Sequence, residues 1–467
     1  MKKWLLLALS ALYAASVINA QRNQSVPDRF KQAIPQLMER DRIPGLSIAW
    51  VSKGAVAWTA NYGVAHAGPN NPVTDSTLFE AASLSKVVTA YASLKLVEIG
   101  SLDLDKPLNT YLGNNYEVGN DQRINQITAR QVLSHSAGFP NWRSESDTAL
   151  PILFNPGERF SYSGEGFVYL ARVMEKITGM PYTEVIAKTV FAPLGMKQSN
   201  MVFLPAFKER YAWRHSWLGK ASGLADYPGA NAAASLRTTA RDYAVFLSAV
   251  LTGKGLKTEM HQEMLRSQIK VDKSQPTLAW GLGIGLEVNR KKEYAWHWGD
   301  QGDSKAFFMA DIKTGHALVY FTNSANGLSV APDLTAIAFG KGTHDILKFV
   351  AYGKFDPVAV RLLEGIERDG ATTALAVYNR ERSQPIGEEM LNSMGYDLLR
   401  NKKTTDAILL FLQNTKDYPN SANVWDSLAE AYMENGEKEL AIRYYEKTLD
   451  LNPQNPNAVN QLKKLKQ

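Results

Sequence analysis

The sequence predicts an α+β protein in which an antiparallel sheet, flanked by helices and accompanied by a helical subdomain, precedes an all-α repeat module. Three observations lead to this class. Short β-like runs occur near residue 50 and again between about 279 and 323, and amphipathic helical segments fill most of the chain between them. The last eighty residues instead follow a fixed period. A chain of 467 residues has room for two or three such units.

Composition restricts the chemistry of the protein. Hydrophobic residues make up 45% and charged residues 21% of the chain, which is typical of a globular protein. The net charge of +6 is spread along the chain instead of gathered in basic runs, so nucleic acid is not an expected partner. The chain has no Cys, which excludes disulfides, thiolate zinc sites and Cys nucleophiles. Catalysis must rest on Ser, His, Lys, Tyr or carboxylates.

The N-terminal residues resemble a cleaved secretory signal. Lys2 and Lys3 precede an apolar run over 4–17, and Ala20 offers a small residue before the polar stretch that follows. About 14 apolar residues are short of the roughly 20 that cross a bilayer. We therefore expect a signal peptide over residues 1–20, a secreted or periplasmic protein, and no stable membrane span after cleavage.

The sheet is expected to form from both ends of one domain. Two β-like runs flank Gly54 and predict a hairpin. Helical spacing follows over 84–99, with Gly100 as its stop, and the region from about 105 to 260 is mainly helical, as in segments 167–178 and 239–252. Strands then return as aromatic and β-branched runs. These runs span residues 279–288, 294–299, 307–311 and 317–323.

The C-terminal residues carry a 34-residue period. The second copy of the pattern consists of Ala422, Trp425, Leu428, Ala429, Tyr432, Ala441, Tyr445 and Pro453, and the first consists of Leu391, Gly395, Leu398, Ala407, Phe411 and Pro419. The pattern resembles the tetratricopeptide repeat, a pair of antiparallel helices that binds protein or peptide partners. We expect repeats over 386–467, with 456–467 as a capping helix, and a helical linker over 346–385. An unrelated helical hairpin is the alternative.

A nucleophile with its own base is indicated at the start of the 84–99 helix. Residues three apart share a helix face, so Ser83 and Lys86 of Ser83-Leu-Ser-Lys86 can meet, and an uncharged lysine could accept the serine proton. A second S-x-x-K occurs at Ser267 to Lys270, but no hairpin leads into a helix there. Position therefore favours Ser83.

Several segments resemble the serine β-lactamase-related family, which includes class C β-lactamases, DD-peptidases, D-aminopeptidases and esterases. The matching segments are 77–90, 127–140, 155–163, Pro193-Leu-Gly-Met196, Gly281-Leu-Gly283 and Trp296-His-Trp-Gly299. They cover about residues 30 to 330 in the family's order. The resemblance implies a five-stranded antiparallel sheet with helices on both faces, a site between this sheet and the helical subdomain, and a hydrolase domain over 21–345.

The resemblance also implies the second catalytic element. The family's Tyr-x-Asn reads Tyr162-Ser-Gly164 here, which makes Tyr162 the expected general acid/base together with Lys86. A nearby lysine would favour the phenolate of this tyrosine. Gly164 departs from the pattern, because the family's Asn binds the substrate amide and the lysine, and glycine can do neither.

The third element, a Lys/His-Thr/Ser-Gly strand motif, has two candidates. Lys313-Thr-Gly315 matches the letters but falls between two strands as a turn, so we assign the motif to His297-Trp-Gly299. By resemblance, Gly299 lets the strand approach substrate, and the N–H groups of Ser83 and Asp300 form the oxyanion hole.

Two nearby residues are not expected to act as catalysts. His135 could complete a Ser/His triad, but its segment is structural in this family. Glu165 could act through water, although no spacing requires it. The sequence contains no cluster with metal-ligand spacing and no phosphate loop, so no metal or other cofactor is expected.

The sequence therefore predicts an exported serine hydrolase that cleaves an ester or amide through an acyl-enzyme on Ser83. One alternative is a DD-peptidase or D-amino-acid peptidase acting on peptidoglycan fragments. Another is a catalytically idle domain whose repeats bind a partner. The expected substrate is a small molecule or a peptide. The sequence does not specify which one, because pocket-lining loops set specificity in a fold that serves many reactions.

Overall fold

The computed structural model describes residues 24–66, 71–113, 116–143, 149–227, 229–272, 274–289, 292–453 and 455–466. The signal peptide expected over 1–20 lies outside these ranges. The chain divides into two compact units, Met1–Ala351 and Tyr352–Gln467. Among the described helices, none combines the length and the apolar character that crossing a membrane requires.

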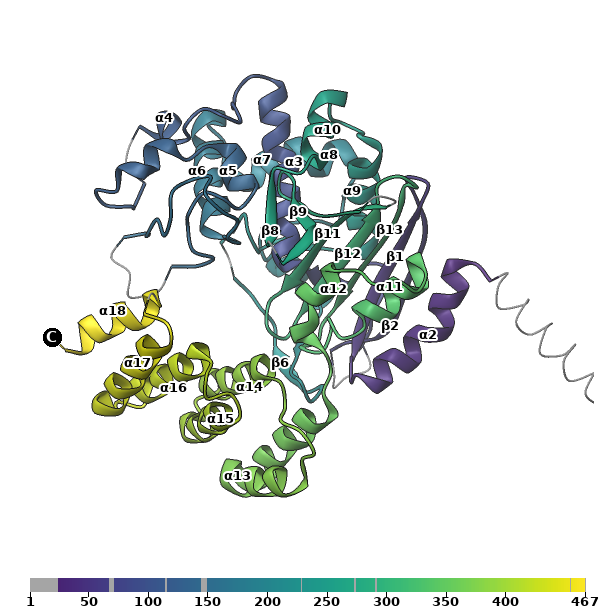
Figure 1. The fold of residues 1–467 in the computed structure, drawn as a ribbon. Helices are drawn as coiled ribbons and strands as arrows, with labels where there is room; N and C mark the ends of the chain where they lie inside the picture. The colour runs from purple at the N-terminus through teal and green to yellow at the C-terminus, as the bar shows by residue number, and fades with distance from the viewer. Residues whose placement is uncertain are drawn as a thin grey trace, which may run out of the picture. The chain divides into compact units, whose positions relative to one another are not determined.

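An antiparallel sheet forms the centre of the first unit (Figure 1). Within the described residues its strand order is β3-β2-β1-β13-β12-β11-β10-β9-β8. The strands are β1 (Gly45–Ser52), β2 (Ala55–His66), β3 (Asn71–Pro72), β8 (Ile269–Asp272), β9 (Gln275–Trp280), β10 (Gly285–Val288), β11 (Glu293–Asp300), β12 (Lys305–Asp311) and β13 (His316–Thr322). The N-terminal strand β1 pairs with the last strand β13, with Ile48 opposite Tyr320. The prediction that both ends of the domain build one sheet is confirmed.

The sheet is wider than the five strands implied by the family resemblance. Strands β2, β1, β13, β12 and β11 form its middle, while β3 extends one edge and β10, β9 and β8 extend the other. The run over 279–288, predicted as one strand, is broken into β9 and β10. Gly283 has a φ of +76°, and a Cβ on it would lie 2.2 Å from the Cβ of Ala90. The backbone turns here because it passes directly against the neighbouring helix.

Helices cover both faces of this sheet (Figure 1). They are α2 (Val26–Arg40) and α11 (Ala331–Phe339) on one face, and α3 (Ser85–Glu98) and α9 (Ala240–Thr252) on the other. Trp50 on β1 contacts Phe30 of α2 and Phe339 of α11, with ring centroids 6.3 and 5.9 Å apart. On the opposite face Tyr243 of α9 contacts Phe321 of β13 at 5.8 Å. Successive side chains of a strand point to opposite faces of the sheet. Because helices cover both faces, the side chains on both faces are apolar.

The helical subdomain lies between the two halves of the sheet in sequence and beside the sheet in space (Figure 1). Its helices include α4 (Asn109–Leu112), α5 (Ala129–Leu133), α6 (Glu165–Thr178), α7 (Tyr182–Ile186) and α8 (Ala192–Leu194), and α10 (Thr258–Leu265) follows α9. Local signals fix several ends. Thr128 and Gln131 form a reciprocal capping box at the start of α5, and Gly179 ends α6 in the left-handed conformation.

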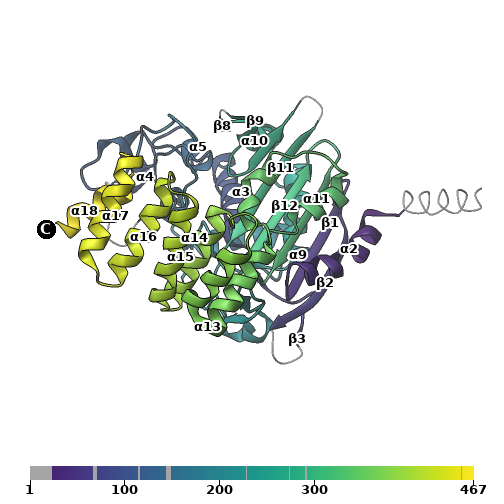
Figure 2. The same ribbon diagram turned by 60° about the horizontal axis from the view of Figure 1, so that its bottom comes forward.

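The second unit is a series of antiparallel helices (Figure 2). Its helices are α13 (Pro357–Glu381), α14 (Glu388–Arg400), α15 (Thr404–Asp417), α16 (Ala422–Glu434), α17 (Lys438–Leu451) and α18 (Pro456–Leu465). The helix pairs α14/α15 and α16/α17 correspond to the two predicted repeat copies. A Cβ on Gly395 would lie 2.5 Å from the ring of Phe411, so the small residue at this position lets the paired helices approach closely.

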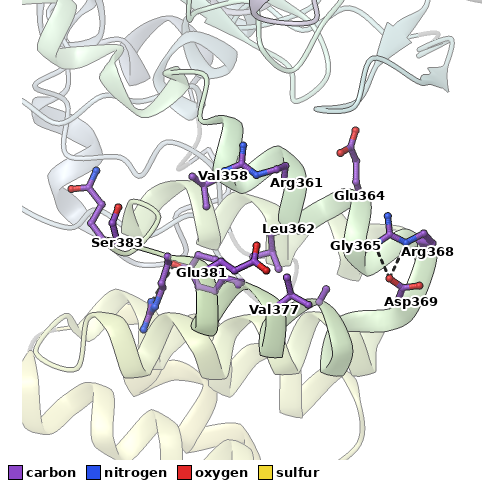
Figure 3. Close-up of a pocket in the computed structure, with 14 residues that line it drawn as sticks. Val358, Arg361, Leu362, Glu364, Gly365, Arg368, Asp369, Val377, Glu381 and Ser383 are labelled. Atoms are coloured by element: carbon purple, nitrogen blue, oxygen red, sulfur yellow. Dashed lines mark hydrogen bonds and ion pairs between the residues drawn. The ribbon is translucent and has the colours of Figure 1, made fainter.

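Helix α13 is itself a hairpin of two helical arms (Figure 3). Gly370 has φ +78° and ψ 162°, values outside the helical region, and the chain reverses there. The arms approach closely where a Cβ on Gly365 would lie 3.0 Å from the Cβ of Ala374. A cavity of about 410 Å³ opens between them, lined by Leu362 and Val377 among others.

The second arm of α13 packs on the first repeat. Asn379 donates a hydrogen bond to Gln413 at 2.8 Å, and Arg382 forms an ion pair with Asp417 at 2.6 Å. The segment expected as a linker, 346–385, is therefore divided in the structure. A short helix, α12 (Ile346–Phe349), belongs to the first unit and α13 belongs to the second.

Candidate active site

Ser83 stands on a tight turn that leads into α3. The turn is a single 3-10 segment, η1 (Ala82–Leu84), and Ala82 has a φ of +46°. A left-handed conformation costs a non-glycine residue about 1–2 kcal/mol, so the surrounding structure must hold it in place. The Ser85 hydroxyl does so by donating to the Ala82 carbonyl at 2.6 Å and accepting from the Leu236 N–H at 2.9 Å. Ser83 remains partly exposed while its neighbours are buried.

Lys86 meets Ser83 as the spacing predicted. Its Nζ lies 3.0 Å from Ser83 Oγ and donates to the Ala233 carbonyl at 2.9 Å. The side chain is fully buried, with 0% of its surface exposed, and burial lowers the pKa of Lys86 to about 7. A large fraction of the amine is therefore uncharged near neutral pH. One N–H then serves the carbonyl and the lone pair can face the serine hydroxyl.

Tyr162 contributes a protonated phenol to the same place. Its ring centroid lies 4.8 Å from Lys86 Nζ. Burial raises the pKa of Tyr162 well above its usual range, and the adjacent Ser83 hydroxyl offsets this only in part. The expectation that Lys86 would favour the phenolate is not met, because desolvation of the enclosed hydroxyl outweighs the influence of a lysine that is itself readily deprotonated.

His297 lies near the end of β11 with both ring nitrogens buried. Its Nδ1 lies 2.7 Å from the carbonyl oxygen of Trp298. A carbonyl can only accept, so Nδ1 carries the proton and Nε2 is an acceptor. No hydrogen-bond partner for Nε2 occurs among the described residues. Burial and the neighbouring Lys86 lower the pKa of His297 to about 3, so the ring is neutral at physiological pH.

Gly299 brings strand β11 against the Ser83 turn. A Cβ on this residue would lie 2.5 Å from the Ala81 carbonyl oxygen and 3.1 Å from the Cβ of Ala82. Only glycine permits this approach without a shift of the strand. The next residue, Asp300, has its carboxylate paired with the ammonium of Lys305. The main chain of β11 and the nucleophile turn are thus held in direct contact.

The competing motifs lie in ordinary structural positions. Lys313-Thr-Gly315 forms the turn between β12 and β13, where Asp311 accepts from the N–H groups of Lys313 and Thr314 at 3.0 Å. Lys270 of the second S-x-x-K bonds to the Pro276 carbonyl at 2.9 Å on the exposed strand β8. The structure brings neither lysine to Ser83.

His135 and Glu165 hold the segments next to Tyr162 in place. His135 packs against the ring of Tyr162 with centroids 4.3 Å apart, and its Nδ1 accepts from the Ser163 N–H at 3.0 Å. Glu165 accepts from Arg143 through both carboxylate oxygens, at 3.2 and 2.9 Å. His135 therefore holds the segment that carries Tyr162, and Glu165 ties the start of α6 to Arg143.

One aromatic residue of this site was not predicted from the sequence. The indole of Trp142 lies over Gly164 and has its ring centroid 5.8 Å from Lys86 Nζ. The only signal in the sequence was the glycine that replaces the family's Asn. Within the described residues no group of three or more His, Asp or Glu side chains could hold a metal ion.

Comparison with known proteins places the first unit in a family. Residues 30–340 match the family model described as Beta-lactamase. The chain belongs to the beta-lactamase family. The predicted family is therefore confirmed, and the homologues of this chain are penicillin-binding proteins and serine hydrolases. Residues 422–455 match the tetratricopeptide repeat model, which corresponds to helices α16 and α17.

Two curated relatives illustrate the similarity. Penicillin-binding protein 4* of Bacillus subtilis (strain 168) is 29% identical over 186 residues, which are 35% of this chain and 39% of that protein. Unguisins hydrolase ungD' of Aspergillus campestris is 26% identical over 250 residues, 48% of this chain and 46% of that protein. The chain thus spans less than half the length of either beta-lactamase-family relative.

A solved structure shares the fold. The octameric penicillin-binding protein homologue from Pyrococcus abyssi aligns with a TM-score of 0.56 and 24% identity, over 72% of this chain and 77% of that one. The predicted fold class, a beta-lactamase-like sheet with flanking helices followed by a helical repeat region, is confirmed.

Proposed function

We propose that this chain hydrolyses carboxylic esters through an acyl-enzyme on Ser83, with Lys86 as the general base and Tyr162 as the general acid. The observation that carries the proposal is the position of Lys86: a fully buried amine, whose pKa is lowered by burial to about 7, lies 3.0 Å from a partly exposed serine hydroxyl. A weak hydroxyl nucleophile needs such a neighbour. The same geometry argues against the idle-domain alternative.

Acylation follows from these groups. The neutral amine of Lys86 takes the Ser83 proton while Oγ bonds to the substrate carbonyl carbon, whose π electrons move to the carbonyl oxygen. The N–H groups of Ser83 and Asp300 are proposed to stabilise this oxyanion, because Gly299 lets strand β11 lie directly against the Ser83 turn. The bond to the alcohol then breaks. The departing oxygen takes the phenolic proton of Tyr162, and the Lys86 ammonium restores that proton.

Deacylation uses the same residues with water in place of the alcohol. Lys86 accepts a proton from water as the water oxygen bonds to the acyl carbon. Ser83 Oγ then leaves and takes a proton from Tyr162, which Lys86 again restores. The raised pKa of Tyr162 suits this role, because the phenol must be protonated when each oxygen leaves.

Two features favour neutral esters over β-lactams and over peptides that end in a carboxylate. His297 is neutral, so it supplies no cation for a substrate carboxylate. Gly164 has no side-chain amide to bind an acylamido group. A D-amino-acid peptidase remains the second candidate, since relatives carry the name penicillin-binding protein.

A substrate panel tests the proposal. An activated ester, nitrocefin and D-Ala-D-Ala peptides are compared, together with labelling by a fluorophosphonate. We expect rapid ester cleavage, slow nitrocefin turnover and a label on Ser83. The Ser83→Ala variant should lose hydrolysis and labelling, while the matched Ser267→Ala variant should keep both. Ester cleavage undiminished in Ser83→Ala would rule out the mechanism, and faster turnover of the peptides than of the ester would favour the peptidase.

We further propose that the protein is exported with its signal removed after residue 20, and that the repeats bind a protein or peptide partner. The expected signal pattern supports the first statement and the tetratricopeptide match supports the second. Sequencing the N-terminus of the native protein tests the cleavage. Cross-linking the native chain with and without residues 352–467 tests whether a partner depends on the second unit.

A further inference from the structure

Trp142 is held in the site by its two neighbours in the chain. The Asn141 side-chain oxygen accepts from the Gly164 N–H at 3.0 Å, and the Asn141 carbonyl accepts from the N–H groups of Gly164 and Glu165 at 2.9 and 3.1 Å. On the other side, the N–H and guanidinium of Arg143 bond to the carboxylate of Glu165. The indole is therefore carried by a short segment fixed at both ends to the start of α6.

The indole occupies space that a side chain at position 164 would need. A Cβ on Gly164 would lie 2.6 to 2.8 Å from three carbons of the Trp142 ring, closer than real Cβ atoms approach. The ring thus lies flat enough on the glycine to exclude any larger residue. The indole of Trp142 can occupy this position only because residue 164 is a glycine.

The exposed part of the ring is available to a ligand. Trp142 is 45% exposed, one of the most exposed large hydrophobic side chains of the first unit, although its ring centroid lies 5.8 Å from the Nζ of the buried Lys86. A rigid aromatic face loses little conformational entropy on binding and gains about 0.5–1.5 kcal/mol when it packs against another ring. Such a face next to the nucleophile is suited to an apolar group of the substrate.

We propose that Trp142 is a substrate-binding residue that selects esters with an aromatic or bulky apolar group, and that Gly164 is required to place its ring. This inference rests on the proposed function, since it assumes that Ser83 attacks an ester. In this proposal the ring packs on the apolar group of the bound ester. An ester without such a group, such as ethyl acetate, should gain nothing from this contact.

Paired substrates separate this role from a general effect on catalysis. One pair varies the acyl group, p-nitrophenyl acetate against p-nitrophenyl phenylacetate, and a second varies the alcohol, ethyl acetate against benzyl acetate. In the Trp142→Ala variant we expect kcat/KM for the aromatic ester of one pair to fall about 3- to 10-fold more than kcat/KM for its small partner. This fold-change is what the loss of one contact between aromatic rings would cause. The loss should appear mainly in KM.

Further variants test the placement of the ring. Trp142→Phe should restore much of the preference, because it returns an aromatic face. Gly164→Asn should lose the preference as Trp142→Ala does, because the new side chain displaces the indole. Ile99→Ala, which removes an exposed apolar side chain at the end of α3, is the matched control and should leave both ratios unchanged. Thermal melting of each variant confirms that it is folded.

The outcomes distinguish this inference from the function on which it rests. Activity retained in Ser83→Ala would overturn the proposed mechanism. With Ser83 established as the nucleophile, unchanged ratios in both pairs for folded Trp142→Ala would overturn the role of Trp142. An equal loss for the aromatic and small members of both pairs would also overturn it, since that pattern indicates a structural effect.

Discussion

The ring of Phe349 packs edge-on against the indole of Trp298, with centroids 4.9 Å apart. Phe349 belongs to α12, and Trp298 is the residue between His297 and Gly299 on the active-site strand. The same ring contacts Trp296 at 5.4 Å. The last helix of the first unit therefore supports β11 from the face away from the nucleophile turn, and a domain boundary at residue 345 would remove it.

We expect truncation after residue 351 to preserve ester hydrolysis, because every proposed catalytic residue and α12 are retained. Truncation after residue 345 deletes Phe349 together with the buried Ile346 and Val350. Burying each such apolar side chain contributes about 1.5–3 kcal/mol, so this shorter chain should melt at a clearly lower temperature and lose activity on heating first. Melting curves and ester rates of the two truncations provide the comparison. Loss of all activity in a folded 1–351 chain would show that the repeats complete the site.

The reaction should respond to pH through Lys86. Since its pKa is about 7 and the neutral amine is the base, kcat/KM for a neutral ester should increase through about pH 7 and level off above it. Lys86→Met should be slower by about two orders of magnitude or more and lose this inflection. A wild-type profile that is flat across this range would contradict the assignment of Lys86 as the base.

The same lysine should make stability depend on pH. Its folded-state pKa of about 7 lies below the ordinary value of 10.5, so between these values the unfolded chain binds more protons than the folded one. Stability then rises with pH by up to about 1.4 kcal/mol per pH unit from this group. Lys86→Met lacks the buried amine and should be more stable than the wild type at pH 7. Its advantage should shrink as the pH rises toward 9.

Denaturant titrations of the wild type and of Lys86→Met at several pH values measure the difference in their free energies of unfolding. The other titratable groups are common to both proteins, so their contributions largely cancel in the comparison. Below about pH 7 the difference should stay constant, because both states of the wild type are then protonated. If the extra stability of Lys86→Met over the wild type increased with pH, the pKa of Lys86 could not be lowered by burial.

The second unit should fold only when α13 is included. The fragment 386–467 contains two helix pairs and α18, but it leaves uncovered the side of α15 where Gln413 and Asp417 bond to Asn379 and Arg382. Repeat modules gain their stability from stacked neighbours, and about three units are needed. Circular dichroism melting should therefore show a cooperative transition for 352–467 and a broad, low one for 386–467. Equal stability of the two fragments would contradict this role for α13.

Local signals explain why much of the fold could be predicted. The hairpin around Gly54, the helix after Ser83 and the turn at Lys313-Thr-Gly315 depend on residues close in sequence, and the structure has all three. The contact between Ser83 and Lys86 follows from helical spacing in the same way. Such features do not depend on what the rest of the chain contributes.

Features created by packing could not be predicted. The break at Gly283 exists because α3 passes against it, and the raised pKa of Tyr162 comes from burial by segments distant in sequence. The position of Trp142 over Gly164 joins two loops 22 residues apart whose approach no local pattern encodes. The hairpin within α13 was likewise hidden, because periodicity shows a helix but not the partner on which each arm packs.

The pairing of β1 with β13 has a consequence for how this protein is made. Ile48 and Tyr320, which face each other in the sheet, are about 270 positions apart, and contacts between such distant residues slow folding because a long loop must close first. The edge of β1 that pairs with β13 therefore stays unpaired until the last strand of the first unit is available. The repeats, whose contacts are local, can then form within moments of their own emergence. We therefore expect the closing of the sheet to be the slow step of folding, and a chaperone that shields β1 to increase the yield of active protein more than one that acts on the repeats.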